Sequence, residues 1–206
     1  MRSTNFDGVA AIYDTLSNVV FGRSMVRAQT FYLRDIPSGA KVLIIGGGTG
    51  WLLNELLVVN STCSVWYIEA SAKMLDLTKE RISKSSNVIH LIHGTENSIP
   101  PDIKFDAVIT HFYLDLFPQT SCDQVIQKIS RSMHAKSMWL VTDFINTTWW
   151  QNILLAVMYK FFRVTCHIEA SQLPEWQDLV KRNGFVEVKS ELFFWKFIRS
   201  SLFASE

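Results

Sequence analysis

The chain has 206 residues, of which 48% are hydrophobic and 19% charged, so its composition is that of a globular domain and excludes a disordered chain. The formal net charge of +1 gives no general attraction to nucleic acid, and no basic stripe is present, so no nucleic-acid partner is expected. No stretch approaches the roughly 20 apolar residues that span a bilayer. Cys63, Cys122 and Cys166 are far apart and fit no metal-ligand spacing, which favours a reduced, cytoplasmic setting and no metal site.

The first two thirds of the chain alternate between helical patterns and short apolar runs. Apolar positions in 5–34 repeat at helical spacing and predict two short helices with a break near Phe21 and Gly22. A helix begins after residue 50, and another follows Ser71, its expected cap, with Met74, Leu75 and Leu77 facing inward. The predicted strands are 41–45, 64–68, 88–92, 105–110 and 137–142, and residues 124–133 are predicted to be helical. This alternation predicts a parallel sheet with helices on both faces.

After residue 143 the alternation changes. Helices are expected at 148–163 and 171–183, and two closely joined strands at 186–192 and 194–200 predict an antiparallel hairpin on the sheet edge. The fold class is therefore α/β, a Rossmann-like, doubly wound and mostly parallel sheet in a single domain. Its predicted parts are an N-terminal helical cover (1–36), a core (37–143), an aromatic lid or insertion (144–170), and the last helix with the edge hairpin (171–206).

A glycine-rich loop follows the first predicted strand directly, as Gly46-Gly-Gly-Thr-Gly50, and leads into a helix. Glycines allow the backbone to turn sharply and approach a ligand, and the start of the helix presents free N–H groups. Glu69 ends the second strand roughly 20 residues later, where a carboxylate can accept both hydroxyls of a ribose. The combination predicts a nucleotide-like cofactor.

Two cofactor classes fit such a loop. A dinucleotide site favours the spacing G-x-G-x-x-G, which from Gly46 would place its last glycine at Trp51. The observed spacing is G-x-G-x-G, which weakens the dinucleotide alternative without excluding it. A nicotinamide-dependent oxidoreductase therefore stays open as a second hypothesis.

Five segments of the chain carry a family resemblance. VLIIGGGTGWLL, YIEAS, HGTENSIP, FDAVITHFYLDLF and WLVTDF resemble the successive motifs of class I S-adenosylmethionine-dependent methyltransferases, and the similarity extends to the NGF turn before the last hairpin. The opening FDGVAAIYD resembles the start of quinone-type and phospholipid-type methyltransferases, in which an N-terminal tyrosine helps to cover the cofactor. The resemblance implies S-adenosylmethionine as cofactor and methyl transfer as activity. A catalytically inactive protein that binds S-adenosylmethionine on the same fold is the other alternative.

The resemblance also implies roles for individual positions. The glycines would line the methionine part of the cofactor, Glu69 would hold its ribose, and the residues after each later strand would surround the adenine and the sulfur. Thr95 and Glu96 are equal candidates for the adenine edge, since the family's usual Gly-Asp is replaced by Gly94-Thr95. The cofactor-contacting positions implied in this way are Tyr13, Gly46, Gly47, Gly48, Gly50, Glu69, Ala70, Ser71, Met74, Thr95, Glu96, Thr110 and His111.

The acceptor side needs positioning more than covalent chemistry, because a sulfonium methyl is already activated. A hydroxyl acceptor would also need a base. His111, Tyr113 and Asp115 follow the fourth strand at the carboxyl end of the sheet, where ligands bind in open α/β folds. His111 and Asp115 are the candidate catalytic residues, although His111 could only pack and Asp115 could cap the next helix. Asp143 either faces the pocket or begins a loop.

Residues 147–163 hold more aromatic side chains than a narrow helix stripe requires. The segment is interpreted as a buried lid, as the wall of a lipophilic acceptor pocket, or as a dimer face or peripheral membrane contact with Lys160 and Arg163 as anchors. The acceptor is expected to be a small aromatic, quinone-like or lipid-like molecule. The predicted substrate contacts are Tyr113, Trp149, Trp150 and Tyr159.

Overall fold

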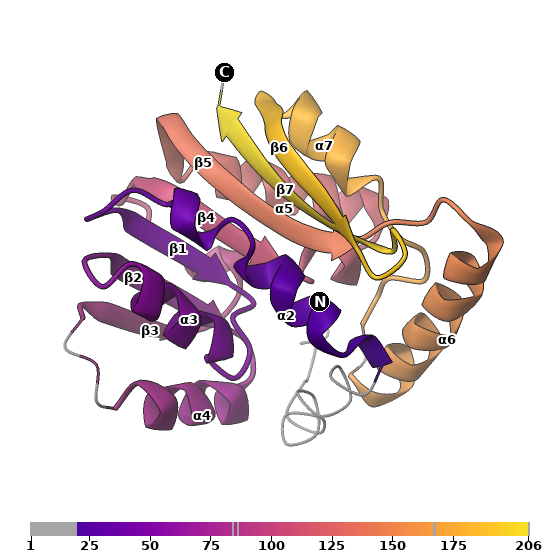
Figure 1. Ribbon diagram of the computed structural model, residues 1–206, viewed down its shortest axis with the longest axis horizontal. Coiled ribbons are helices and arrows are strands. Elements are labelled where there is room, and N and C mark those ends of the chain that lie inside the picture. The colour runs from indigo at the N-terminus through magenta and orange to yellow at the C-terminus, as the bar shows by residue number, and fades with distance from the viewer. Residues whose placement is uncertain (1–19, 84, 86, 167, 206) are drawn as a thin grey trace.

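The computed structural model describes residues 20–83, 85, 87–166 and 168–205 (Figure 1). In this part of the chain seven strands form one sheet in the order β3-β2-β1-β4-β5-β7-β6. The strands are β1 Lys41–Ile45, β2 Ser64–Glu69, β3 Ile89–His93, β4 Phe105–His111, β5 Met133–Phe144, β6 Phe185–Phe193 and β7 Ile198–Ser205. Strands β1 to β5 pair in parallel, whereas β7 runs antiparallel to both β5 and β6. The predicted doubly wound sheet with an edge hairpin is confirmed.

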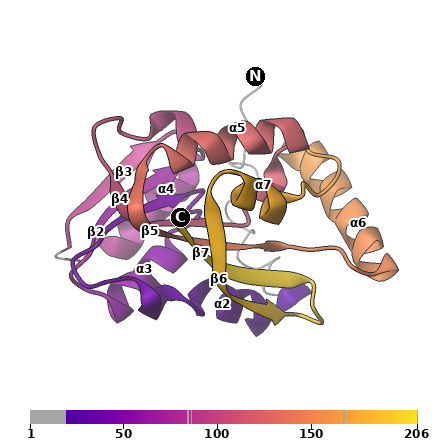
Figure 2. The same cartoon turned by 90° about the horizontal axis from the view of Figure 1, so that it is seen from above.

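Helices cover both faces of the sheet, as Figure 2 shows from above. Helices α5 and α7 lie on one face, and α2, α3 and α4 lie on the other. Helix α6 stands beyond the carboxyl ends of the parallel strands. The α-helices are α2 Arg23–Thr30, α3 Trp51–Val59, α4 Ala72–Ile82, α5 Gln119–Ser130, α6 Trp149–Thr165 and α7 Trp176–Arg182, and the short 3-10 helices are η1 Leu33–Asp35, η2 Glu96–Ser98 and η3 Leu114–Leu116.

The central strand β1 shows why the parallel strands are continuous apolar runs. Successive side chains of a strand point to opposite faces of the sheet. Leu43 and Ile45 pack with α5 and α7, while Val42 and Ile44 pack with α3, and all four are essentially inaccessible to solvent. Because helices cover both faces, no polar residue alternates with the apolar ones.

The N-terminal helical segment is partly described. The predicted break is confirmed at Gly22, whose φ of 55° lies in the left-handed region and which directly precedes α2. The predicted cap of α4 is also confirmed, since the Ser71 side chain accepts a hydrogen bond from the amide of Met74 at 3.2 Å. The prediction that Leu77 faces inward is wrong: Leu77 is 38% exposed, and Thr78, one full turn after Met74, is buried in its place.

Several boundaries differ from the prediction for local reasons. Helix α7 begins at Trp176 and not at 171, because Pro174 cannot continue a helix through that segment. Helix α5 begins at Gln119, after Pro118, and so precedes the predicted start at 124. Strand β7 begins at Ile198 because residues 194–196 all have positive φ and form the turn of the hairpin.

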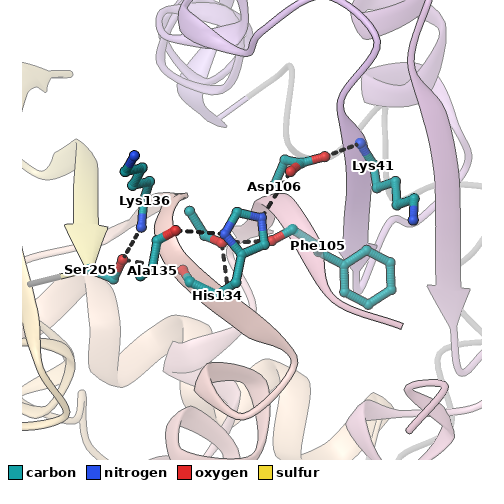
Figure 3. A network of polar contacts seen from close by, with 8 residues as sticks. Lys41, Phe105, Asp106, His134, Ala135, Lys136 and Ser205 are labelled. Carbon is teal, nitrogen blue, oxygen red and sulfur yellow. Dashed lines mark hydrogen bonds and ion pairs between the residues drawn. The ribbon is translucent and has the colours of Figure 1, made fainter. Parts of the chain in front are cut away.

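A polar network joins the strands at the amino edge of the sheet (Figure 3). Asp106 accepts hydrogen bonds from the Lys41 amide at 2.8 Å and from Nε2 of His134 at 2.9 Å. Nδ1 of His134 donates to the Ala135 carbonyl at 2.7 Å, so both ring nitrogens have partners. The network therefore ties β1, β4 and β5 together at the edge opposite α6.

Two further expectations concern the chain as a whole. Cys63, Cys122 and Cys166 are free and buried. Among the described residues, no helix has the length and apolar content needed to cross a membrane.

Candidate cofactor and acceptor site

A cavity of about 460 Å³ opens at the carboxyl ends of the parallel strands. One part of its wall comes from the loop after β1 and from the ends of β2 and β3. The rest comes from α2, from the ends of β4 and β5, and from α6. This is the edge at which ligands bind in open α/β sheets, because the crossover loops separate there. A volume of this size is typical of small-molecule sites.

The glycine loop is held in one shape by close contacts. A Cβ atom on Gly47 would come within 2.1 Å of the Tyr67 ring, so a larger residue cannot take its place without displacing that ring. Gly48 has a φ of 69°, and its amide donates a hydrogen bond to Oε2 of Glu69 at 2.8 Å. The loop and the acidic end of β2 therefore form one unit, as the sequence predicts for a nucleotide-like cofactor.

Two residues that support this loop were not predicted. The hydroxyl of Tyr67 donates to the carbonyl of Gly48 at 2.9 Å, and the hydroxyl of Thr78 lies 3.2 Å from the same carbonyl. Tyr67 is next to Ile44 in the register of β1 and β2, which brings it beside the loop. No pattern in the sequence pairs these positions, because the contact depends on how strands and helices pack.

Glu69 has the properties that a ribose-binding carboxylate requires. Its side chain lines the cavity although the residue is only 5% exposed, and Oε1 accepts a hydrogen bond from the Ser71 amide at 2.7 Å. Burial raises the pKa of Glu69, while the amides of Ser71 and Gly48 oppose that shift. Each carboxylate oxygen has a second lone pair for a further donor. The two hydroxyls of a ribose could donate to these two oxygens.

The predicted adenine contacts divide into two groups. Ala70, Met74 and Thr95 line the cavity, as the family resemblance implies. Glu96 does not, because its carboxylate accepts a hydrogen bond from the hydroxyl of Tyr113 at 2.8 Å and is buried there. Of the two candidates for the adenine edge, the geometry favours Thr95. Glu96 instead fixes the orientation of Tyr113, whose side chain is part of the cavity wall.

Two other predicted cofactor contacts have different outcomes. Thr110 does not line the cavity: it is fully buried, and its hydroxyl accepts a hydrogen bond from Nε1 of Trp139 at 2.9 Å. Alternation along β4 sends the Thr110 side chain to the opposite face from that of His111, which does line the cavity. The geometry therefore does not support a position of Thr110 beneath the sulfur. Tyr13 lies outside the described residues.

His111 and Asp115 are buried polar residues in the cavity wall. Within the described residues, the two ring nitrogens of His111 have no hydrogen-bond partner, and Oδ1 of Asp115 has none either. Burial lowers the pKa of His111 to about 3, and the nearby backbone of Gln29 opposes this shift. Burial raises the pKa of Asp115 to about 7. His111 is therefore neutral at physiological pH.

Asp143 is placed behind this site and is not part of the cavity wall. Its Oδ1 accepts a hydrogen bond from the Phe144 amide at 2.8 Å, and its Oδ2 accepts one from the Asp115 amide at 3.2 Å. Burial, together with the neighbouring carboxyl group of Asp115, raises the pKa of Asp143. Asp143 therefore positions the loop that carries Asp115.

Helix α6 lines the cavity, but not through the aromatic residues that were predicted. Trp149 is 75% exposed, and Trp150 packs against Trp195 and Phe197. Tyr159 is buried and donates its hydroxyl to the Asp115 carbonyl at 3.2 Å. None of these three α6 residues is part of the cavity wall, whereas Tyr113 is. The α6 residues in the cavity wall are Leu154, Val157, Met158, Phe161 and Phe162.

Part of the chain matches a known protein family. Residues 42–136 match the family described as "Methyltransferase domain". Over these residues the chain is similar to methyltransferase domains. The matched residues include the glycine loop, Glu69, His111 and Asp115. No curated protein sequence matches the chain.

Solved structures share the fold of this chain at low sequence identity. Mitomycin 7-O-methyltransferase MmcR superposes with a TM-score of 0.71 at 14% identity, over 100% of this chain and 62% of that one. Magnesium protoporphyrin IX methyltransferase (ChlM) from Synechocystis PCC 6803 with bound SAH gives 0.68 at 15% identity, over 89% and 83%. A structure of the Haloferax volcanii Trm112 activator in complex with a methyltransferase gives 0.72 at 13% identity, over 97% of both chains. The chain thus spans 62% of the length of the mitomycin enzyme.

Proposed function

We propose that this protein transfers the methyl group of S-adenosylmethionine to a small lipophilic or aromatic acceptor. The observation that carries the proposal is a single cavity that joins the glycine loop and Glu69 to an apolar chamber. The chamber is walled by residues of α2 and α6 such as Met25, Leu154 and Met158. A chamber of this kind takes an apolar body and excludes water from the reacting atoms.

The polar groups in the chamber define what the acceptor must carry. Asp115 presents a carboxyl oxygen without a partner, and His111 presents a neutral imidazole, both against an otherwise apolar wall. Bound S-adenosylmethionine supplies an activated methyl group, so the protein has to orient the acceptor and accept its proton. A hydroxyl or amine that donates to Asp115 would satisfy the buried carboxyl group. We therefore expect an acceptor with one such group on an apolar framework.

The similar structures support a small acceptor. Mitomycin 7-O-methyltransferase and magnesium protoporphyrin IX methyltransferase are both named for small-molecule acceptors. A protein that only bound the cofactor would need no chamber beside the glycine loop, whereas this cavity extends from the glycine loop to α6. The match to a methyltransferase domain favours methyl transfer over the nicotinamide-dependent alternative.

A direct test is a methyl-transfer assay with isotope-labelled S-adenosylmethionine. The acceptor panel would contain phenols, quinols, alkyl amines and fatty acids, with a folded protein and an RNA as comparison. We expect the label only in small apolar acceptors. Mass spectrometry of the products would verify which acceptor gains a methyl group. Transfer only to the protein or to the RNA would refute the proposal.

A matched pair of variants tests the role of the chamber. Met158→Trp places a larger side chain in the cavity wall, whereas Val58→Trp changes an exposed residue on α3. We expect Met158→Trp to raise the KM for the acceptor at least tenfold and to leave the affinity for S-adenosylhomocysteine unchanged. Val58→Trp should change neither quantity.

A further inference from the structure

Helix α6 carries a row of exposed apolar side chains on its outer side. Trp149, Ile153, Val157, Phe161 and Val164 are 75%, 56%, 62%, 37% and 73% exposed. They follow one another at intervals of three or four residues and so lie along one face of the helix. We call these five residues the α6 outer stripe. Among the described residues, none buries these five side chains as core side chains are buried.

The other face of the same helix packs against the domain. Leu155 and Tyr159 are only 5% exposed and belong to the core cluster that includes Phe144 and Phe197. Gln151 is buried and forms a capping box with Thr148. The position of α6 is therefore fixed by its inner face, and the outer stripe contributes nothing to that packing. An apolar face that a domain does not use for its own core marks an interaction surface.

The charges of α6 are all positive. Its 17 residues contain Lys160 and Arg163 and no Asp or Glu. Both basic residues are exposed, and Lys160, seven residues after Ile153 and four before Val164, lies on the same side as the stripe. The surface therefore combines an apolar row with cations and has no acidic residue of its own.

The β6–β7 turn extends this surface. Its Trp195 is 79% exposed and Lys196 is also exposed. The turn lies beside the first turn of α6 in Figures 1 and 2, and Nε2 of Gln151 donates to the Lys196 carbonyl at 3.0 Å. A second exposed tryptophan and a third cation thus accompany the outer stripe. Tryptophan and lysine are the residues that anchor proteins at a membrane–water interface.

From this combination we infer that the α6 outer stripe, with Trp195 and Lys196, binds the surface of an anionic lipid bilayer. A helix with apolar and aromatic residues flanked by cations can lie in the plane of the interface, where cations meet lipid phosphates and apolar side chains enter the acyl boundary. A second copy of the chain fits less well. Facing copies of α6 would bring two sets of cations together without a carboxylate on either helix.

The inferred surface adjoins the acceptor chamber. Val157 and Phe161 belong to the outer stripe and also line the cavity. Bound to a bilayer, the protein would therefore hold one wall of the chamber at the lipid surface, and a lipophilic acceptor could enter without crossing water. This consequence rests on the proposed function, whereas binding to the bilayer does not.

The test is flotation of the full chain with lipid vesicles, without cofactor or acceptor. One set of vesicles contains phosphatidylcholine alone, and the other also contains phosphatidylglycerol. We expect the chain to float with the anionic vesicles and to be released by salt. Lys160→Glu should weaken binding at least about fivefold, the effect of removing one cation from an anionic surface.

Two matched variants test the apolar part of the surface. Val164→Glu and Val58→Glu each place a carboxylate at an exposed valine, 73% exposed on α6 and 74% exposed on α3. Neither residue lines the cavity. We expect Val164→Glu to lower vesicle binding at least tenfold and Val58→Glu to leave it within twofold of the unchanged chain.

Other occupants of the surface give different results. A chain that does not float with anionic vesicles, or that loses binding equally in both valine variants, overturns the inference. So does a lipid-free dimer in sedimentation that Val164→Glu converts to a monomer, because a second copy would then occupy the stripe. Since these measurements need no methyl transfer, their failure would leave the proposed function standing, and a failed methyl-transfer assay would leave vesicle binding unaffected.

Discussion

The two edges of the parallel sheet each carry a histidine and an aspartate, in opposite circumstances. At the amino edge, His134 and Asp106 bond to each other and to backbone groups, with side chains 41% and 40% exposed. At the carboxyl edge, His111 and Asp115 are buried in the cavity wall, and each has polar atoms without a partner among the described residues. The same two residue types thus have opposite surroundings at the two edges.

The pKa shifts follow from this difference. Burial opposes ionisation of Asp106, but the Lys41 amide and His134 together hold its pKa below the ordinary value. The Ala135 carbonyl and Asp106 raise the pKa of His134. At the carboxyl edge burial dominates, lowering the pKa of His111 and raising that of Asp115. Paired groups at the surface stabilise the fold, whereas unpaired buried groups cost stability and are typical of a functional site.

The largest effect is expected for Asp115→Asn, which removes the proton acceptor and keeps the shape of the side chain. Loss of a general base lowers rates by about 10² to 10⁴, so kcat for a hydroxyl acceptor should fall within that range. The affinity for S-adenosylhomocysteine in calorimetry should not change. If kcat stays within threefold of the original value, Asp115 only packs or caps, and the contrast between the two edges loses its functional meaning.

The next effect compares carboxylates at the two edges. Glu69→Ala removes an acceptor of ribose hydrogen bonds, and bonds to charged groups contribute about 1.5–3 kcal/mol each, so affinity for S-adenosylhomocysteine should fall at least about tenfold. Asp106→Ala removes a carboxylate that also has two hydrogen-bond partners, the Lys41 amide and the His134 ring, but that lies far from the cavity. Its cofactor affinity should equal that of the unchanged chain. Equal losses in both variants would show that Glu69 acts through stability alone.

A smaller effect concerns pH. Because burial raises the pKa of Asp115 to about 7, its basic form increases as pH rises through that value. For a hydroxyl acceptor, kcat/KM should therefore be about tenfold lower at pH 6 than on the plateau above pH 8. His111, with its pKa lowered to about 3, should contribute no step above pH 5. A profile that decreases with rising pH would contradict the assignment of Asp115 as the base.

The smallest effect belongs to the amino edge. A histidine with a raised pKa contributes stability that is fully present below its ordinary pKa near 6.5 and is lost as pH rises through its folded value. Because His134 and Asp106 are partly exposed, the contribution should be below about 1 kcal/mol. Urea unfolding of His134→Ala should show this loss at pH 5.5 and a smaller one at pH 8.5. A larger loss at the higher pH would mean that the network does not depend on a charged imidazole.

Local patterns predicted the part of the site that is local in sequence. The run before Gly46, the glycine loop and Glu69 are each set by neighbouring residues, so their positions were predicted correctly. Helix α6 was predicted as an element, but its orientation was not. Its inner face is fixed by residues far away in the chain, which is why Trp149 points outward and Met158 lines the cavity.

The positions of Thr110 on β4 and Glu96 on η2 depend on packing in a similar way. Thr110 and Glu96 were assigned to the cofactor from motif position alone. Thr110 instead bonds to Trp139 on β5, and Glu96 bonds to Tyr113, and both contacts depend on the packing of segments at least 17 residues apart. Their hydrogen-bond partners distinguish Thr110 and Glu96 from His111 and Asp115. A sequence pattern does not show these partners.

The central claim is that one cavity at the carboxyl edge holds S-adenosylmethionine beside an apolar acceptor chamber. A crystal structure of the full chain grown with S-adenosylhomocysteine tests it most directly. The account predicts ribose hydroxyls on the Glu69 carboxylate, adenine near Met74 and Thr95, and the sulfur facing the chamber that holds His111 and Asp115. A nucleoside bound elsewhere, or a glycine loop that binds a pyrophosphate while S-adenosylhomocysteine is absent from the cavity, would contradict it.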